Sequence, residues 1–556
     1  RLRDLGLCPK YIRLFKKDRN ENFFRKFCSK KFIFERLIGC SELRKQTVDR
    51  RFTLMYPMLQ ATFSATQCTL KGFDKRARFH SLSIPRPFAH EYFKNLHRLT
   101  IPMRYVDLFC GIGGFHAALH RLGHECVFAS DIDIHAAAVY ELNWGQPQGY
   151  SVNCDLRKVI DEIPPMDIIC AGFPCQPFSK SGSQKGFTDQ TRGTLFHDIC
   201  TIAEKHQPSV IFLENVPNLV KHDGGNTFSV IQSRLSELGY DHEYAILSPN
   251  KFGVPQVRKR VYIVAIRSDL LNGEKFVFPN EHDVNSLDVR TILDEHVPEK
   301  YSMSEKEIHW LEMWQEFLIN VNVETKLPGH PIWADSFKGD AALPGDLEQY
   351  SVDELIQIHN NWSSYGWVRP IESGMEKTEI IKQINLPLWK QDFVKKNRHL
   401  YSENKDFIDE WLKRWKVLEN DKDGKPLIPV SRTKYEWQAG PVSRSNWENI
   451  FQFRPSGIRV KRGDYFPALV AMAQIPVVGW LRRHLTPKEC ARIQSFDVDG
   501  VFGKPFILGE KDSQSYKQLG NAVNVNMIIE IQSAIDSLLV PQSINVNRNS
   551  RPPVQK

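Results

Sequence analysis

Short apolar runs recur along residues 105–266, and segments with helical spacing separate most of them. The runs at 105–109, 126–131, 167–173, 210–215 and 261–266 are rich in Val, Ile and Phe. Runs of this length, bounded by turns, are typical of strands that are buried on both faces. The alternation predicts an α/β fold with a doubly wound sheet, which binds its ligands at the carboxyl ends of the strands.

Three helices of this predicted fold have recognisable ends. Apolar residues recur at helical spacing over 115–122, and Gly123 is a typical stop. Near the other end of the chain, Thr486 has the position of an N-cap, with Pro487 in the first turn and Glu489 completing a capping box. A last helix is expected after 520–521, with its apolar side formed by Ile528, Ile531, Ile535 and Leu538.

The alternation stops near residue 268 and returns after 457. We therefore expect a first domain at 103–267 that is resumed at 458–540, with an inserted second domain of mixed structure at 268–457. The insert is rich in Trp, Asn, Lys and acidic residues, and polar linkers interrupt it. A loose tail is expected at 541–556.

Charge separates the first hundred residues from the rest. Residues 1–102 hold 23 Lys and Arg against 8 Asp and Glu, a net charge of +15, whereas the remaining 51 basic and 57 acidic residues leave −6. This basic segment lacks periodicity, and Met103 stands just before the first predicted strand. We expect 1–102 to be upstream translated sequence or a dispensable extension, with a nucleic-acid arm as the alternative.

Composition limits the classes of protein to consider. Apolar residues make up 41% and charged residues 25% of the 556, as in ordinary globular proteins. No run of about 18 apolar residues occurs, so no membrane span is expected. The eleven cysteines are scattered without a C-x-x-C pair or metal-type spacing, which predicts reduced thiols, no metal site and a cytosolic compartment.

A glycine turn follows the first predicted strand. Gly111, Gly113 and Gly114 would let the backbone approach a ligand closely. Asp131 ends the second strand, where acidic residues accept hydrogen bonds from ribose hydroxyls in such folds, and Asp155 could accept from an adenine amino group. These residues favour a nucleoside-bearing cofactor, and a glycine turn that serves packing alone is the alternative.

One cysteine lies between two prolines at the ligand side of the sheet. Cys175 follows the strand 167–173, and a thiol there can act as a nucleophile if its surroundings favour the thiolate. Glu214 ends the next strand and offers a carboxyl group, while Arg258 and Arg260 stand at alternate positions of a later strand. Taken singly, these residues could be an inert thiol, a helix cap and a solvated edge.

In their order along the chain, these residues form a set of motifs. They are 107–115 (Asp-Leu-Phe-Cys-Gly-Ile-Gly-Gly-Phe), 174–179 (Pro-Cys-Gln-Pro-Phe-Ser), 193–196 (Gly-Thr-Leu-Phe), 214–216 (Glu-Asn-Val), 256–260 (Gln-Val-Arg-Lys-Arg), 485–492 and 514–522. The set closely resembles the DNA (cytosine-5) methyltransferases, in the bacterial modification-methylase form. The resemblance spans about 103–540 and does not include 1–102.

The resemblance implies a Rossmann-like class I methyltransferase fold with S-adenosylmethionine as the cofactor. Cofactor contacts would then be made by Phe109, Gly111, Gly113, Gly114, Asp131 (ribose), Ile132 (adenine ring), Asp155 (adenine amino group), Leu195, Asn521 and Ala522. The same resemblance adds Gln176, Ser179 and Ser181 as substrate-binding residues and implies no metal.

The resemblance also implies a mechanism. Cys175 would add to carbon 6 of a cytosine, while Glu214 would hold or protonate ring nitrogen 3. Arg258 would hold the ring oxygen and Arg260 would brace the site. A duplex hides carbon 6 in the base stack, so the target base would be flipped out.

The insert 268–457 lies where this family carries its target-recognition domain, which implies double-stranded DNA as the partner. Arg454, Arg459, Lys461 and Arg462 form a basic patch at its end. A monomer in the bacterial cytoplasm, associated with the nucleoid through DNA, is expected, and a cognate restriction endonuclease would act separately if one exists. The alternatives are a tRNA cytosine-5 methyltransferase, which the long insert disfavours, and a catalytically silent DNA-binding protein.

Overall fold

The structure is a computed structural model, and it describes most of the chain after the basic extension. The described residues are 102–174, 195–282, 288–323, 327–337, 345–363, 371–385, 387–441, 444–471 and 474–549. All of them fall within the unit Ile84–Lys556. None of the described helices is long and apolar enough to cross a membrane.

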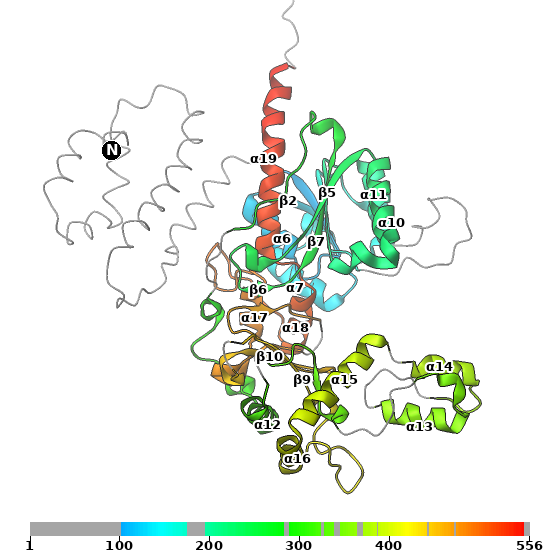
Figure 1. The fold of residues 1–556 in the computed structure, drawn as a ribbon. Coiled ribbons are helices and arrows are strands. Elements are labelled where there is room, and N and C mark those ends of the chain that lie inside the picture. The colour runs from blue at the N-terminus through cyan, green and yellow to red at the C-terminus, as the bar shows by residue number, and fades with distance from the viewer. Residues whose placement is uncertain are drawn as a thin grey trace, which may run out of the picture. The chain divides into compact units, whose positions relative to one another are not determined.

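The first sheet has six strands, in the order β2-β1-β3-β4-β7-β5, of which Figure 1 labels β2, β5 and β7. They are β1 (Arg104–Leu108), β2 (Glu125–Ser130), β3 (Ile168–Ala171), β4 (Val210–Asn215), β5 (Tyr240–Leu247) and β7 (Arg260–Arg267). The first four in this order are parallel, and β7 runs antiparallel to β4 and β5. All five predicted runs form strands of this sheet, which confirms the α/β fold.

The sequence did not predict β5, because its apolar and polar residues do not form a buried run. Tyr244 and Ile246 are exposed on this edge strand. Its pairing with β7 extends over eight residues, from Tyr240 opposite Arg267 to Leu247 opposite Arg260. Backbone pairing with an apolar neighbour therefore compensates for a weak local preference.

Helices cover both faces of the first sheet. Figure 1 shows α10 (Leu195–His206) and α11 (Asn226–Glu237) on one side and α6 (Gly114–Leu122) and α19 (Val525–Asn549) on the other. Successive strand residues alternate between the two cores, so Tyr105 faces the layer of α6 and α19, and Val106 faces the layer of α10. This double burial explains why the strands contain almost only apolar residues.

The predicted helix ends are confirmed. The helix α6 stops at Gly123, whose φ of 89° lies in the left-handed region. The helix α17 (Pro487–Ile493) begins at Thr486, whose side chain accepts from the backbone of Glu489 in a capping box. The remaining helices of this region are α7 (Ile134–Trp144), α8 (Leu156–Val159) and α18 (Asp512–Asn521).

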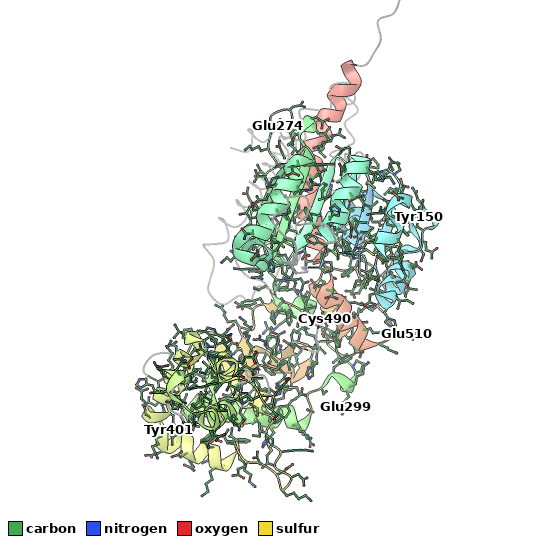
Figure 2. All side chains as sticks on the ribbon, turned by 90° about the vertical axis from the view of Figure 1, so that its right-hand side faces the viewer. Tyr150, Glu274, Glu299, Tyr401, Cys490 and Glu510 are labelled. Atoms are coloured by element: carbon green, nitrogen blue, oxygen red, sulfur yellow. The ribbon has the colours of Figure 1, made fainter. Side chains whose placement is uncertain are left out.

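A second sheet of six strands organises the middle of the chain, in the order β14-β13-β10-β11-β9-β8. Its strands are β8 (Ile332–Trp333), β9 (Lys434–Gln438), β10 (Ile450–Arg454), β11 (Gly457–Lys461), β13 (Val477–Val478) and β14 (Arg483–His484). The helices of this part are α12 (Glu305–Asn320), α13 (Val352–Ser363), α14 (Lys377–Ile384), α15 (Leu388–Glu403) and α16 (Lys405–Arg414). Figure 2 draws the side chains of both parts and labels Tyr401 on α15 and Cys490 on α17.

The second sheet extends beyond the boundary predicted at 457. The strand β11 pairs with β10 and β9, and β13 and β14 follow it in the same sheet, so this sheet continues to His484. A short pairing of β12 (Phe466–Pro467) with β6 (Gln256–Val257) joins the two parts. At the end of the chain, α19 continues to Asn549, inside the predicted tail. Apolar runs alone do not show to which sheet a strand belongs.

Candidate active site

The carboxyl ends of β1, β2, β3 and β4 surround a cavity of about 450 Å³, here called the strand-end cavity. Phe109 and Gly111 border it from the first turn, Asp131 from the second and Glu214 from the fourth. Segments from the end of the chain, including Asn521 and Ala522, close its other side. The parallel strands therefore bring together residues that are about four hundred positions apart, as expected for a doubly wound sheet.

Gly111 allows the close approach of a ligand. A Cβ atom added there would meet no atom within 4 Å, and its φ of +56° is one that L side chains rarely adopt. Its N–H donates to Oδ2 of Asp131 at 2.8 Å. The neighbouring Phe109 also has a positive φ, 56°, which turns the chain sharply at the mouth of the cavity.

Gly113 and Gly114 pack closely against other segments of the chain. A Cβ atom on Gly113 would lie 2.6 Å from Nε1 of Trp144, and one on Gly114 would lie 2.6 Å from Cγ2 of Val523. Both glycines are needed because helix α7 and the segment after α18 pack directly against this turn. Of the three glycines, only Gly111 is among the described residues that border the strand-end cavity, and the cofactor contacts of Gly113 and Gly114 stay predictions.

Asp131 offers a half-buried carboxylate to the cavity. Its Oδ1 accepts from the N–H of Asp133 and its Oδ2 from that of Gly111, both at 2.8 Å. Burial raises the pKa of Asp131, and the two N–H groups offset part of that rise. Each carboxylate oxygen can accept a second hydrogen bond, so Asp131 can still receive hydroxyl donors from a ligand.

Three further predicted cofactor residues, besides Gly113 and Gly114, do not border the cavity. Ile132 is 76% exposed, although it follows Asp131 directly. Asp155 is the N-cap of α8 and accepts from the N–H of Arg157 at 3.2 Å. Leu195 begins α10 and is half-buried. Their predicted contacts with the adenine end of a cofactor stay predictions.

Glu214 and Arg260 form an ion pair at the cavity wall. Nε of Arg260 lies 3.0 Å from Oε1 of Glu214, and the two side chains are 17% and 10% exposed. Burial raises the pKa of Glu214, while the charges of Arg260 and Arg258 limit the rise. A carboxyl group in this position can hold a proton near neutral pH more readily than an exposed one.

Arg258 uses its two terminal nitrogens within the protein, and its predicted contact with a substrate oxygen stays a prediction. Its Nη1 donates to the carbonyl of Leu469 at 2.8 Å, and its Nη2 donates to the carbonyls of Gly520 and Ala522 at 3.0 and 2.9 Å. The residue is 2% exposed. Arg258 and Arg260 therefore have different partners: the first ties the C-terminal segment to the site, and the second pairs with the acid.

Asn215, which the sequence reasoning did not select, links two motifs. Its Nδ2 donates to the carbonyl of Phe173 at 2.8 Å, and its Oδ1 accepts from the N–H of Val216. This bond fixes the segment Gly172–Pro174, which borders the cavity beside Glu214. Its place in the motif 214–216, at the end of a buried strand, is the signal that could have indicated it.

Four predicted residues follow directly after that segment. Cys175, Gln176, Ser179 and Ser181 lie outside the described residues. The described chain ends at Pro174 and resumes at Leu195, the first residue of α10. Their proposed contacts with the base and with DNA therefore stay predictions.

The strand-end cavity suits a nucleoside-bearing cofactor. Its volume lies in the range of small-molecule sites. The ring of Phe109 offers an apolar wall, and Asp131 offers acceptors for hydroxyl groups. The open space beside Gly111 lets a ligand approach the protein backbone closely. Among the described residues, no group of three or more His, Cys, Asp or Glu side chains could hold a metal ion.

The predicted basic patch lies on one face of the second sheet. Arg454 and Arg459 both pair with Glu436, at 3.5 and 2.7 Å, and Lys461 bonds Gln438. Arg462 pairs with Asp464 at 2.7 Å. The opposite face of the same strands, including Tyr435 and Val460, is buried in an aromatic core. We call Glu436, Gln438, Arg454, Arg459 and Lys461 the polar sheet face.

Known proteins are similar to this chain over most of its length. The model of the family described as C-5 cytosine-specific DNA methylase matches residues 103–537. Type II methyltransferase M.AluI of Cellulosimicrobium cellulans is 33% identical over 485 residues, 77% of this chain and 90% of that protein. M.HhaI of Haemophilus parahaemolyticus is 45% identical over 187 residues, 33% of this chain and 55% of that protein. A solved structure of a Spodoptera frugiperda DNMT2 mutant covers 78% of this chain and 99% of its own, with 19% identity and a TM-score of 0.40.

Proposed function

Since the chain belongs to the C-5 cytosine-specific DNA methylase family, we propose how the residues around the strand-end cavity divide the reaction among them. The protein is a DNA (cytosine-5) methyltransferase, and S-adenosylmethionine is its methyl donor. The observation that carries our assignment is the buried pair of Glu214 and Arg260 at the cavity wall, next to the segment that leads to Cys175.

S-adenosylmethionine supplies an electrophilic methyl group on a positively charged sulfur. Asp131 accepts hydrogen bonds from the ribose hydroxyl groups of this cofactor, Phe109 packs against the cofactor, and Gly111 leaves room for its close approach. Asn521 and Ala522 close the cavity from the C-terminal side, where Arg258 fixes the Ala522 carbonyl. Ile132, Asp155 and Leu195 are proposed to contact the adenine end.

Carbon 5 of cytosine is a weak nucleophile, and the side chains activate it. The Cys175 thiolate forms a bond to carbon 6, and the proton of the Glu214 carboxyl group goes to ring nitrogen 3, so that carbon 5 gains enamine character. When the methyl group moves to carbon 5, S-adenosylhomocysteine leaves; ring nitrogen 3 then returns its proton to Glu214, and a base removes the proton from carbon 5. The electrons of that C–H bond restore the ring double bond, and the thiolate leaves carbon 6.

Arg260 is the better placed of the two arginines for the substrate. Its Nε pairs with Glu214 and its Nη1 donates to the Lys259 carbonyl, while its Nη2 bonds no described residue. We assign to Arg260 the orientation of the Glu214 carboxyl group and a contact with the ring oxygen. Arg258 has the structural role described above.

The second region is proposed to read the DNA, with the polar sheet face as one part of its contact surface. Gln176, Ser179 and Ser181 are proposed to contact the flipped nucleotide. We propose a monomer, located in the bacterial cytoplasm on nucleoid DNA, that acts separately from any cognate endonuclease. The charges of Arg454, Arg459 and Lys461 support the polar sheet face as a DNA contact, because cations on one face suit the phosphates of a duplex.

Methyl transfer from labelled S-adenosylmethionine to unmethylated DNA, followed by bisulfite sequencing, tests the substrate. We expect 5-methylcytosine within one short sequence, and label in tRNA but not in DNA would contradict the assignment. Trapping on DNA that contains 5-fluorocytosine tests the nucleophile. Cys175→Ser is expected to form no covalent complex, and a complex as abundant as that of the native protein would refute the role of Cys175.

A further inference from the structure

Two helices meet at one edge of the strand-end cavity, and two polar contacts hold them together. Nζ of Lys517, in the middle of α18, lies 3.0 Å from Oδ2 of Asp133, the N-cap of α7. One residue further, Nε2 of Gln518 donates to the carbonyl of His135 at 2.9 Å. Lys517, Gln518 and Asp133 all border the cavity. We call these two contacts the helix clasp.

Asp133 uses its two carboxylate oxygens for different partners. Oδ1 accepts from the N–H groups of His135 and Ala136, at 3.0 and 3.3 Å, and thereby caps α7. Oδ2 faces Lys517. Burial alone would raise the pKa of Asp133, but Lys517 and the capped N–H groups lower it overall. Helix capping and ion pairing can therefore be separated by a substitution that keeps one and removes the other.

The clasp lies close to the predicted ribose site. Asp131 is two residues before Asp133, and the charges of both Asp133 and Lys517 act on its carboxyl group. The Lys517 ammonium balances one of two neighbouring carboxylates that border the same cavity. The net charge at this end of the cavity thus depends on the ion pair.

We propose that Lys517 and Asp133 are positioning residues for S-adenosylmethionine: their ion pair holds α18 against the first turn of α7 and sets the charge beside Asp131. The proposal rests on the cofactor site assigned above. It predicts effects on cofactor binding in the absence of DNA, where no chemistry takes place. Lys517 and Asp133 would be separate from the residues that contact the cytosine.

Four variants test the helix clasp. Asp133→Asn keeps the cap, because Asn is as good an N-cap as Asp, and removes the charge of the pair. Lys517→Met keeps the stem of the side chain and removes its charge, and the double variant removes both. Lys517→Arg keeps the pair. The matched control is Lys300→Met, because Lys300 pairs with Asp512 at 2.6 Å in the first turn of the same helix and does not border the cavity.

The readout is the dissociation constant of S-adenosylhomocysteine, measured by calorimetry without DNA. Lys517 and Asp133 are 56% and 34% exposed, so we expect a weakening of about twofold to fivefold in each single variant. The double variant should bind S-adenosylhomocysteine at least as tightly as the single variant with the larger loss. Lys517→Arg and Lys300→Met should match the native protein. Unchanged constants in both single variants, additive losses in the double variant, or an equal loss in Lys300→Met would overturn the proposal.

A charge comparison gives a second readout that a purely structural role would not change. S-adenosylmethionine carries one more positive charge than S-adenosylhomocysteine, and the extra charge is on its sulfur. Lys517→Met leaves an unbalanced carboxylate and should shift the preference toward S-adenosylmethionine, while Asp133→Asn should shift it the other way. Equal shifts, or none, would contradict the charge role. A native protein that bound neither ligand would instead contradict the cofactor site itself.

Discussion

The two six-stranded sheets of this protein bury their strands in different ways. Apart from the edge strand β5, the strands of the first sheet are apolar on both faces and lie between helices, so their polar residues lie near the strand ends. The second sheet is apolar on one face, where Tyr435 stacks on Trp314 at 4.7 Å, and polar on the other, where Arg459 pairs with Glu436. The first arrangement places polar side chains at the carboxyl ends of the strands, where they form a site, and the second presents polar side chains across one face of the sheet.

The largest expected effect concerns the carboxyl ends of the strands of the first sheet. Glu214→Gln keeps the size of the side chain but removes the titrating group, so we expect the kcat to fall by a factor of about 10² to 10⁴. The dissociation constant of S-adenosylhomocysteine should change little, because the clasp and Asp131 are intact. Steady-state methylation and calorimetry measure the two quantities, and a normal kcat would remove Glu214 from the mechanism.

The pH profile of the native enzyme sharpens that test. Burial raises the pKa of Glu214, so its proton is kept to a higher pH than that of an exposed carboxyl group. If the protonated form acts as the acid, single-turnover rates should fall as the pH rises through this raised pKa. Glu214→Gln should lack this fall of the rate at alkaline pH. A fall at the same pH in the variant would show that another group titrates there.

The next effect separates the two regions by stability. Trp314 is fully buried and contacts Trp411 at 5.2 Å and Tyr435 at 4.7 Å. Trp314→Ala should destabilise the second region by about 3–5 kcal/mol. Hydrogen exchange should quicken in β9 and β10 and stay native in β1 and β3. Equal quickening in both sheets would show that the regions unfold as one unit.

Arg258 lies where the two regions meet, and its replacement should affect both. Arg258→Met leaves the carbonyls of Leu469, Gly520 and Ala522 without their donor, which should cost about 3 kcal/mol of unfolding free energy. Arg260→Met is the matched control, since it should lower the methylation rate with a smaller loss of stability. Urea denaturation measures both variants. If Arg260→Met were the less stable of the two, the proposed division between the arginines would be reversed.

The sequence predicted the first region better than the second for a physical reason. Apolar runs and glycine turns are local signals, so the five strands, the end of α6 and the capping box at Thr486 could be read directly. The edge strand β5 depends on its pairing with β7, and the three donor bonds of Arg258 depend on partners 211 to 264 positions along the chain. The stacking of Trp314 on Tyr435 joins residues about 120 positions apart, and no local pattern indicates it.

The same limit applies inside the site. The spacing of Arg258 and Arg260 suggested that both face one ligand, because residues two apart on a strand point the same way. In the structure, β7 begins only at Arg260, and Arg258 precedes it outside a strand. Likewise the glycine motif identified a close approach but not its partner, which is Trp144 for Gly113 and open space for Gly111.

The smallest effect tests whether the polar sheet face contacts DNA. If Arg459 neutralises one phosphate, Arg459→Gln should lower the slope of log affinity against log salt concentration by about 0.9, with DNA binding measured by fluorescence anisotropy. Arg414→Gln is the control, because Arg414 is an exposed arginine of the same region that pairs with Glu316 on the helical side. Its slope should stay native. Equal slopes for the native protein and Arg459→Gln would remove the polar sheet face from the DNA contact. Glu436→Gln frees Arg454 and Arg459 from their shared carboxylate and should therefore strengthen DNA binding at low salt, with no such change in Arg414→Gln.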